Sequence, residues 1–131
     1  MRVTPLAGIR VLLVDDDELV RDALHEFFVE CGAIVVAASS ARAGLEALLQ
    51  APPDVLVSDL RMPPAEDGFW LLAAIRALEP AQGAHVPAVA VTGDVMAASQ
   101  AMAAGFQAVH DKPPRLPELA ALVARLAGVP R

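Results

Sequence analysis

The sequence is poor in cysteine, aromatic residues and long apolar runs. Its 131 residues include one cysteine, one tryptophan, four phenylalanines and no tyrosine. A single cysteine excludes an internal disulfide, and Cys31 falls on the apolar side of a predicted helix, so we expect a buried, inert thiol. No stretch approaches the roughly 20 apolar residues of a membrane span. The first apolar run is too short, and too soon followed by acids, for a secretion signal. We therefore expect a cytoplasmic protein without membrane association.

Basic residues are also scarce. Ten lysines and arginines stand against sixteen aspartates and glutamates, giving a formal net charge of −6, and no basic patch is visible. The sequence therefore argues against direct nucleic-acid binding through phosphate contacts. Nine of the ten basic residues are arginine, and Lys112 is the single lysine. This choice suggests that position 112 needs a compact ammonium rather than a planar guanidinium.

The apolar residues alternate between strand-like and helical patterns. The chain length suits one domain over residues 1–131, with a core from about 9 to 127. Apolar runs of strand length occupy residues 10–14, 33–37, 55–58, 88–91 and 108–110. Helical patterns follow them over residues 19–31, 41–50, 68–78, 96–104 and 116–127. This alternation predicts an α/β fold with a parallel sheet and helices packed on it.

Carboxylates gather where the predicted strands end. Asp15, Asp16 and Asp17 follow the first strand, and Asp59 follows the third. Parallel strands end at one edge of a sheet, where such sheets place ligands. Two carboxylates about 4 Å apart repel by about 4 kcal/mol at an effective dielectric of about 20, so a cation must offset the cluster. Hard oxygen ligands without a neighbouring histidine or cysteine favour Mg²⁺ or Mn²⁺ over Zn²⁺.

Each of these residues also has a purely structural interpretation. Asp17 fits a cap of the following helix, and Asp15 and Asp16 fit solvated loop acids. Thr92, at the end of the fourth strand, and Lys112, after the fifth, fit ordinary turn and surface positions. These interpretations leave unexplained why acids, a hydroxyl and an ammonium all meet at one sheet edge. That combination suits phosphate chemistry.

The segments VLLVDDDELVR, PDVLVSDLRMP, DGFWLL, PAVAVTG and HDKPP occur in this order along the chain. Together they resemble the receiver domain of bacterial two-component response regulators. The resemblance implies a flavodoxin-like, doubly wound fold, with five parallel strands in the order 2-1-3-4-5 and five flanking helices. It also implies a cis bond between Lys112 and Pro113.

The resemblance assigns roles to single residues. Asp59 would be the phospho-acceptor, with Thr92 and Lys112 binding the phosphoryl group. Mg²⁺ would be the cofactor, held by Asp15, Asp16, Asp59 and Arg61. The phosphoryl donor would be a sensor histidine kinase or a histidine phosphotransfer protein, with an output domain or partner protein downstream. The expected function is a signalling switch that catalyses only its own phosphorylation and dephosphorylation.

Three features depart from the family pattern. Val109 stands where receivers usually have an aromatic side chain that swings inward on phosphorylation. Three residues, instead of two, separate Met62-Pro63 from Asp67-Gly68. Trp70 occupies a position that is commonly polar, where it either packs against that loop or contacts a partner.

These departures change what is expected of the output face. Thr92, the loop after it and the fourth helix would carry any response, with Met96, Met102 and Phe106 available for contact. A related hypothesis concerns Arg61 and Asp94, two residues beyond the acceptor and the threonine respectively. They are expected to face each other across the mouth of the site and to hinder the attacking water.

Three other functions compete with a phosphorylated receiver. A phosphatase with an aspartate nucleophile needs a second aspartate two residues later as acid and base, and Arg61 stands there instead. A degenerate receiver that only docks partners would fit the departures at Val109 and in the loop, and a phosphorylation assay separates the two. Flavin binding on the same fold is disfavoured, because the acids after the first strand would repel a phosphate.

Overall fold

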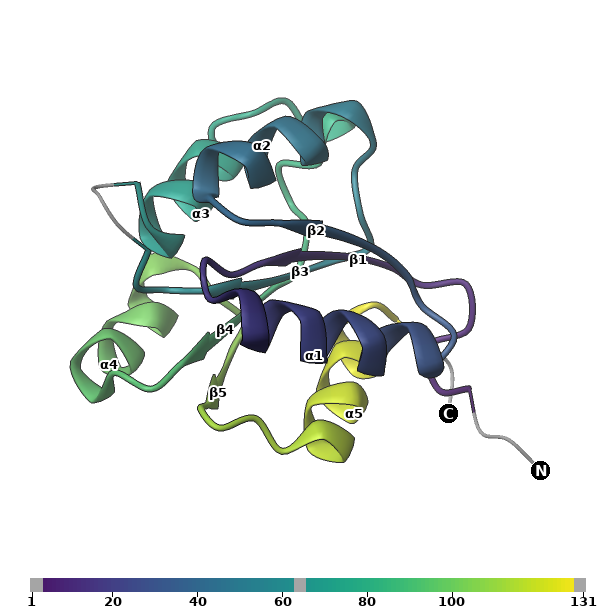
Figure 1. Ribbon diagram of the computed structural model, residues 1–131. Helices are drawn as coiled ribbons and strands as arrows, with labels where there is room; N and C mark the ends of the chain where they lie inside the picture. The colour runs from purple at the N-terminus through teal and green to yellow at the C-terminus, as the bar shows by residue number, and fades with distance from the viewer. Residues whose placement is uncertain (1–3, 63–65, 129–131) are drawn as a thin grey trace.

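The chain forms a five-stranded parallel sheet in the order β2-β1-β3-β4-β5, as the family resemblance implied (Figure 1). The computed structural model describes residues 4–62 and 66–128. The strands are β1 (Arg10–Val14), β2 (Ile34–Ala38), β3 (Val55–Asp59), β4 (Ala88–Thr92) and β5 (Ala108–Asp111). The helices are α1 (Glu18–Glu30), α2 (Ala41–Gln50), α3 (Gly68–Arg76), α4 (Val95–Ala104) and α5 (Leu116–Leu126), with a 3₁₀ turn at Pro80–Gln82. The peptide bond between Lys112 and Pro113 is cis, as expected.

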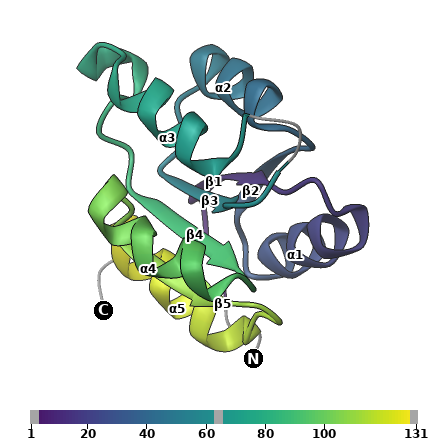
Figure 2. The same cartoon turned by 90° about the vertical axis from the view of Figure 1, so that its left-hand side faces the viewer.

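Helices cover both faces of the sheet, which makes the fold doubly wound (Figure 2). Side chains alternate along β1, so Leu12 and Val14 join one core cluster while Val11 and Leu13 join the other. The first cluster is covered by α2, α3 and α4, and the second by α1 and α5. Because β3 and β4 are buried on both faces, they read as continuous apolar runs rather than as alternating ones.

Hydrogen-bond register sets several element ends that the apolar pattern placed differently. β2 lies one residue later than predicted, because Ile34 pairs with Arg10 and Ala38 with Val14. β1 and α2 have the predicted ends, and the remaining differences are of one or two residues. β3, β4 and β5 each run one residue further than expected, since pairing continues into the polar residues Asp59, Thr92 and Asp111. The strands therefore include the polar residues at the sheet edge.

Two expectations about surface apolar residues were wrong. Phe106 is buried at 2% exposure and cannot offer a contact, because it packs edge-on against Phe69. Leu19 begins the apolar pattern that predicted the first helix over residues 19–31, yet it is 83% exposed. It lies in the first turn, at the end of the helix nearest the edge of the sheet. Met96 and Met102 on α4 are exposed, as predicted.

Gly68 begins α3 where the chain passes very close to the end of β3. Its N–H donates to the carbonyl of Leu60, 3.1 Å away. A Cβ at this position would lie 2.3 Å from the backbone oxygen of Asp59 and 2.9 Å from the Cα of Leu60. These are main-chain atoms, so no side-chain rotation can relieve the clash. Glycine here lets α3 start directly against the strand that carries Asp59.

We therefore expect Gly68→Ala to lower the free energy of unfolding by about 1–3 kcal/mol, the usual cost of overpacking. Urea unfolding measures it. Gly93→Ala is the matched control, because its added Cβ would meet only the Lys112 side chain at 3.6 Å. Equal stability of the two variants would contradict the close approach at Gly68.

Candidate functional site

The sheet topology brings Asp15 and Asp59 together. β1 and β3 are neighbours, and the last pair in their register joins Val14 to Ser58. Asp15 follows that pair on one strand and Asp59 on the other, so both carboxylates reach the same edge. Asp15 is 1% exposed and Asp59 is 7% exposed. Two acids this deeply buried require a compensating partner.

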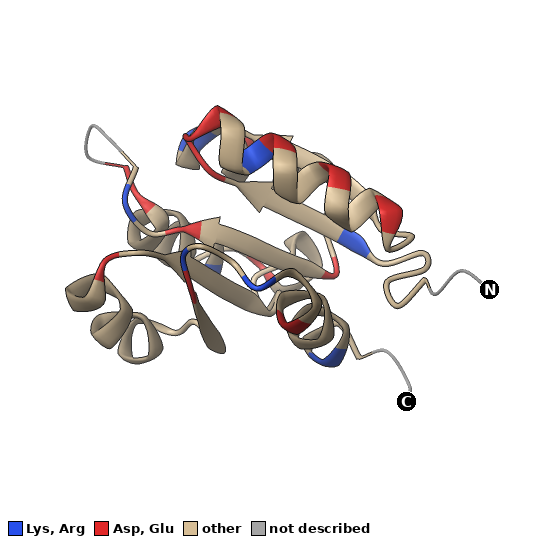
Figure 3. Ribbon diagram, turned by 60° about the horizontal axis from the view of Figure 1, so that its bottom comes forward, with Lys and Arg blue, Asp and Glu red and all other residues tan. Residues whose placement is uncertain are grey.

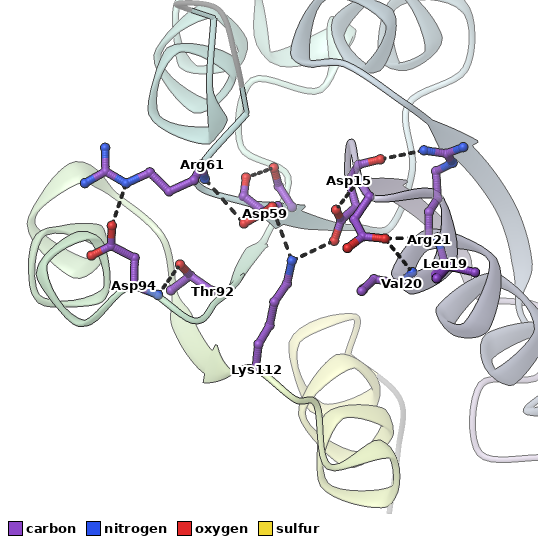
Figure 4. A network of polar contacts seen from close by, with 11 residues as sticks. Asp15, Leu19, Val20, Arg21, Asp59, Arg61, Thr92, Asp94 and Lys112 are labelled. Carbon is purple, nitrogen blue, oxygen red and sulfur yellow. Dashed lines mark hydrogen bonds and ion pairs between the residues drawn. The ribbon is translucent and has the colours of Figure 1, made fainter.

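Lys112 supplies part of that compensation (Figure 4). Its Nζ lies 3.1 Å from Asp15 Oδ2 and 3.2 Å from Asp59 Oδ2. Burial alone would lower the pKa of Lys112, but the hydrogen bonds and charges of Asp15 and Asp59 outweigh it and the pKa is raised. The ammonium therefore stays charged and contacts both acids at once.

Backbone and side-chain donors fix the two carboxyls further. The N–H of Asp17 donates to Asp15 Oδ1 at 2.9 Å, and the N–H of Arg61 donates to Asp59 Oδ1 at 3.3 Å. The Arg21 guanidinium donates to the carbonyl of Asp15 at 2.9 Å. This role of Arg21 could not be predicted from the sequence, because no spacing rule links a helix residue to a main-chain oxygen six positions earlier. Asp17 caps α1, as expected.

Asp15, Asp16 and Asp59 form a group suited to a metal ion. One carboxylate oxygen from each lies within 4.8 Å of the others, with Asp16 exposed and the other two buried. Three carboxylates and the ammonium of Lys112 leave a formal charge of −2 among these four residues. A divalent cation would balance it, and oxygen donors match Mg²⁺. The residues present therefore fit the expected ion.

The environment of Asp59 penalises its ionised form. Burial raises the pKa of Asp59, and the nearby Asp15 adds to the rise; Lys112 and the N–H of Arg61 oppose it without cancelling it. A carboxyl with a raised folded-state pKa contributes stability below its unfolded pKa and loses it as the pH rises through the folded value. At neutral pH the charge on Asp59 therefore costs stability in the metal-free protein.

Thr92 and the Arg61–Asp94 pair lie beside the acid cluster (Figure 4). Thr92 is buried, and its Oγ1 accepts a hydrogen bond from the N–H of Asp94 at 3.1 Å. Arg61 Nε donates to Asp94 Oδ2 at 2.8 Å, so these two side chains do meet, as the sequence hypothesis required. Val109 is half-buried against the core.

Trp70 packs on the protein rather than standing free. Its ring is half-buried against the core cluster, and the guanidinium of Arg42 lies 5.2 Å from the ring centroid. Arg42 also pairs with Glu66, which precedes α3. Trp70 therefore packs against the core cluster and Arg42. The loop residues 63–65 lie outside the described part of the chain.

Comparisons with known proteins place this geometry in a family. Residues 11–124 match the family model described as the response regulator receiver domain. An uncharacterized 14.6 kDa protein of Leptolyngbya boryana is 38% identical over 120 residues, covering 90% of this chain and 89% of the relative. The response regulator protein FleR of Pseudomonas aeruginosa is also 38% identical over 120 residues, but this chain spans only 24% of its length.

Solved structures agree with that assignment. A putative response regulator from Chloroflexus aurantiacus superposes with a TM-score of 0.83 at 27% identity, covering 92% of this chain and 98% of the other. The receiver domain of sensor histidine kinase PA1611 from Pseudomonas aeruginosa superposes with a TM-score of 0.83 at 25% identity. The superposition covers 93% of this chain and 99% of the other. That structure carries a magnesium ion in its active site cleft.

The family receives a phosphoryl group on an aspartate with Mg²⁺, and its members bind that ion in an acidic pocket. In the described part of this chain, no helix combines the length and apolarity needed to cross a membrane. The family match over residues 11–124, the strand order and the acidic cluster agree with one another. This chain therefore belongs to the receiver domain family of two-component response regulators.

Proposed function

We propose that Asp59 is the phospho-acceptor of this chain. The observation that carries the proposal is the contact of Lys112 with Asp15 and Asp59 at the carboxyl edge of the sheet. A carboxylate oxygen of Asp59 attacks the phosphorus of a phosphohistidine in line, so an O–P bond forms as the N–P bond breaks. The imidazole leaves with the bonding electron pair and takes up a proton.

The neighbouring residues divide the work of binding the transferred group. Lys112 carries the positive charge that faces the phosphoryl oxygens, and the Thr92 hydroxyl can donate to one of them. Asp15, Asp16 and Asp59 would hold Mg²⁺ through carboxylate oxygens. Arg61 could join them only through its main-chain oxygen, because a guanidinium has no acceptor. When bound, the ion neutralises charge on the acids and the phosphoryl group.

The same site returns the domain to its resting state. Water attacks the phosphorus, the acyl O–P bond breaks, and inorganic phosphate leaves with the Asp59 carboxylate restored. Release of phosphate from a small-molecule substrate would need a second acid and base near Asp59. Arg61 occupies that position and is paired with Asp94, so a phosphatase is disfavoured. We also propose that the domain acts in the cytoplasm and that a further domain or a partner protein produces the output.

A domain that only docks partners is the remaining alternative. Such a domain gains nothing from holding Asp15 and Asp59 below 10% exposure, where an ionised carboxylate is costly. Phosphoryl transfer needs that burial, because fixed charges act more strongly where water is excluded. The burial of the acids therefore favours an active acceptor.

Labelling with a small phosphoryl donor tests the acceptor directly. Acetyl phosphate with Mg²⁺ is expected to add one acid-labile phosphoryl group to the protein, seen as a single mass increment on the intact chain. Asp59→Asn should abolish it, since a neutral amide is a poor nucleophile. Asp54→Asn, an exposed acid at the other end of the sheet, is the control and should label normally. Full labelling of the Asp59 variant would refute the assignment.

Metal binding can be tested without phosphorylation. Mg²⁺ is expected to raise the melting temperature of the wild type by mass action, because it binds the folded acid cluster and relieves its repulsion. Asp16→Ala should remove most of that shift, since Asp16 belongs to the cluster and is exposed, so folding does not depend on it. Asp22→Ala on α1 is the control for lost charge. An undiminished shift of the melting temperature in the Asp16 variant would exclude the cluster of Asp15, Asp16 and Asp59 as the metal site.

A shallow apolar groove beside the acceptor offers a docking place for the phosphohistidine donor. It has a volume of about 310 Å³ and is lined by Leu19, Val20, Ala23, Leu24, Pro114 and Leu116. One wall is the start of α1, which follows Asp15 and Asp16 in the chain. The other wall is the segment that follows Lys112. α1 has exposed acidic residues along its length (Figure 3). We infer that the donor presents an apolar helix face flanked by basic residues.

Leu19→Glu should therefore slow phosphotransfer from a histidine kinase or phosphotransfer protein by tenfold or more, as expected for a central interface residue. Labelling by acetyl phosphate should not change, because the substitution leaves Asp15, Asp59 and Lys112 in place. Val95→Glu is the matched control, since Leu19 and Val95 are both 83% exposed in the first turn of a helix. If both variants lose transfer equally, the groove is not the donor site.

A further inference from the structure

One side chain connects the site to the first turn of α4. Asp94 Oδ1 accepts the N–H of Ala97 at 3.0 Å and so caps the helix, while Asp94 Oδ2 accepts Arg61 Nε at 2.8 Å. The N–H of Asp94 donates to Thr92 Oγ1 at 3.1 Å. On the other side, the N–H of Arg61 donates to Asp59 Oδ1 at 3.3 Å. A continuous set of contacts therefore runs from the acceptor to α4 (Figure 4).

The packing of α4 makes this cap important. Its buried residues are Ala97 and Ala101, two small side chains that bury little apolar area. Val95, Met96 and Met102 are exposed, and the helix has no charged residue (Figure 3). Little side-chain packing therefore holds the first turn, and the orientation of the Asp94 carboxylate contributes a large part of its local stability.

The guanidinium of Arg61 has two possible anionic partners, Asp94 and a phosphorylated Asp59. Its side chain is 59% exposed, so it can reorient without disturbing the core. Phosphorylation places a charge of about −1.5 to −2 on Asp59, together with strong acceptor oxygens. Arg61 lies only two residues further along the chain, and guanidinium groups bind phosphoryl oxygens well. Asp94 and the phosphoryl group would then compete for one guanidinium.

We propose that Arg61 exchanges Asp94 for the phosphoryl group of Asp59, and that the loss of this ion pair frees the Asp94 carboxylate and loosens the first turn of α4. Arg61 acts as a positioning residue that reports the charge of the acceptor to the exposed apolar surface formed by Val95, Met96 and Met102. The inference rests on the proposed role of Asp59 and adds the route by which that residue is read.

The lifetime of the aspartyl phosphate separates this exchange from a fixed barrier. Arg61→Gln removes the guanidinium that covers the phosphoryl group, so the lifetime should shorten severalfold. Asp94→Asn keeps an oxygen for the cap but removes the competing charge, so Arg61 should bind the phosphoryl group more fully and lengthen the lifetime. If the pair were only a static obstacle to water, both variants would shorten it, and that result would overturn the exchange.

Hydrogen exchange at the amides of Ala97 and Ala98 provides the second measurement. In the wild type, beryllofluoride with Mg²⁺, a phosphoryl mimic, should speed exchange by up to about fivefold, the range of an exposed ion pair. In Arg61→Gln the exchange should already be fast and should change little on adding the mimic. Arg115→Gln is the matched control, because it removes another exposed arginine pair, with Glu118 on α5, and should behave as the wild type. A full response in Arg61→Gln would refute the coupling.

An error in the acceptor assignment and an error in the coupling would give different results. If acetyl phosphate adds no mass to the wild type, the acceptor assignment is wrong and the coupling is wrong with it. If the wild type is labelled but the two lifetimes move in the same direction, the coupling alone is wrong and Asp59 stands as the acceptor.

Discussion

Lys112 reaches from the end of β5 to acids on β3 and β1, two and three strands away in the sheet. Its ammonium is what makes it possible to keep Asp15 and Asp59 buried and close together, because an unpaired buried carboxylate would take up a proton instead. The contact also explains the choice of lysine. A single compact nitrogen can lie within about 3 Å of two oxygens from different residues, whereas a planar guanidinium is shaped to hold both oxygens of one carboxylate.

The compensation by Lys112 is incomplete, and the remaining charge has chemical consequences. The pKa of Asp59 is still raised, chiefly by burial, so the ionised form of the acceptor is disfavoured in the absence of a cation. A divalent ion would relieve the repulsion between the acids and, at the same time, admit an anionic phosphoryl group. Stability is thus reduced at the residue that reacts, while the buried strands on either side supply the apolar packing that tolerates it.

Much of this arrangement could be predicted from the sequence, for reasons that differ between elements. Apolar runs and their spacing predicted the parallel strands and the five helices, and the family resemblance implied the strand order. Strands that end at one edge predicted the proximity of Asp15, Asp59 and Lys112. Strand ends were missed because pairing in register carries β3 and β4 into polar residues that the apolar pattern excludes. Leu19 was misplaced because helical periodicity identifies a face without saying which neighbour covers it. Phe106 follows α4, and no local pattern shows that Phe69 of α3 covers it. Arg21 and the contact of Arg42 with Trp70 depend on tertiary positions that no local pattern encodes.

Two exposed apolar surfaces lie on opposite sides of the acceptor, and they differ in charge. The groove between α1 and the segment after Lys112 is bordered by acids, whereas α4 is uncharged along its whole length. A donor that must approach Asp59 closely meets an anionic site, so a basic donor surface is favoured and would be steered towards the groove. A partner that reads α4 meets no such field, and its affinity must depend on apolar contact with Val95, Met96 and Met102. Phosphorylation of Asp59 and recognition of the phosphorylated state can therefore involve different partners. The groove selects a partner by charge, whereas α4 selects one by the conformation of a weakly packed helix.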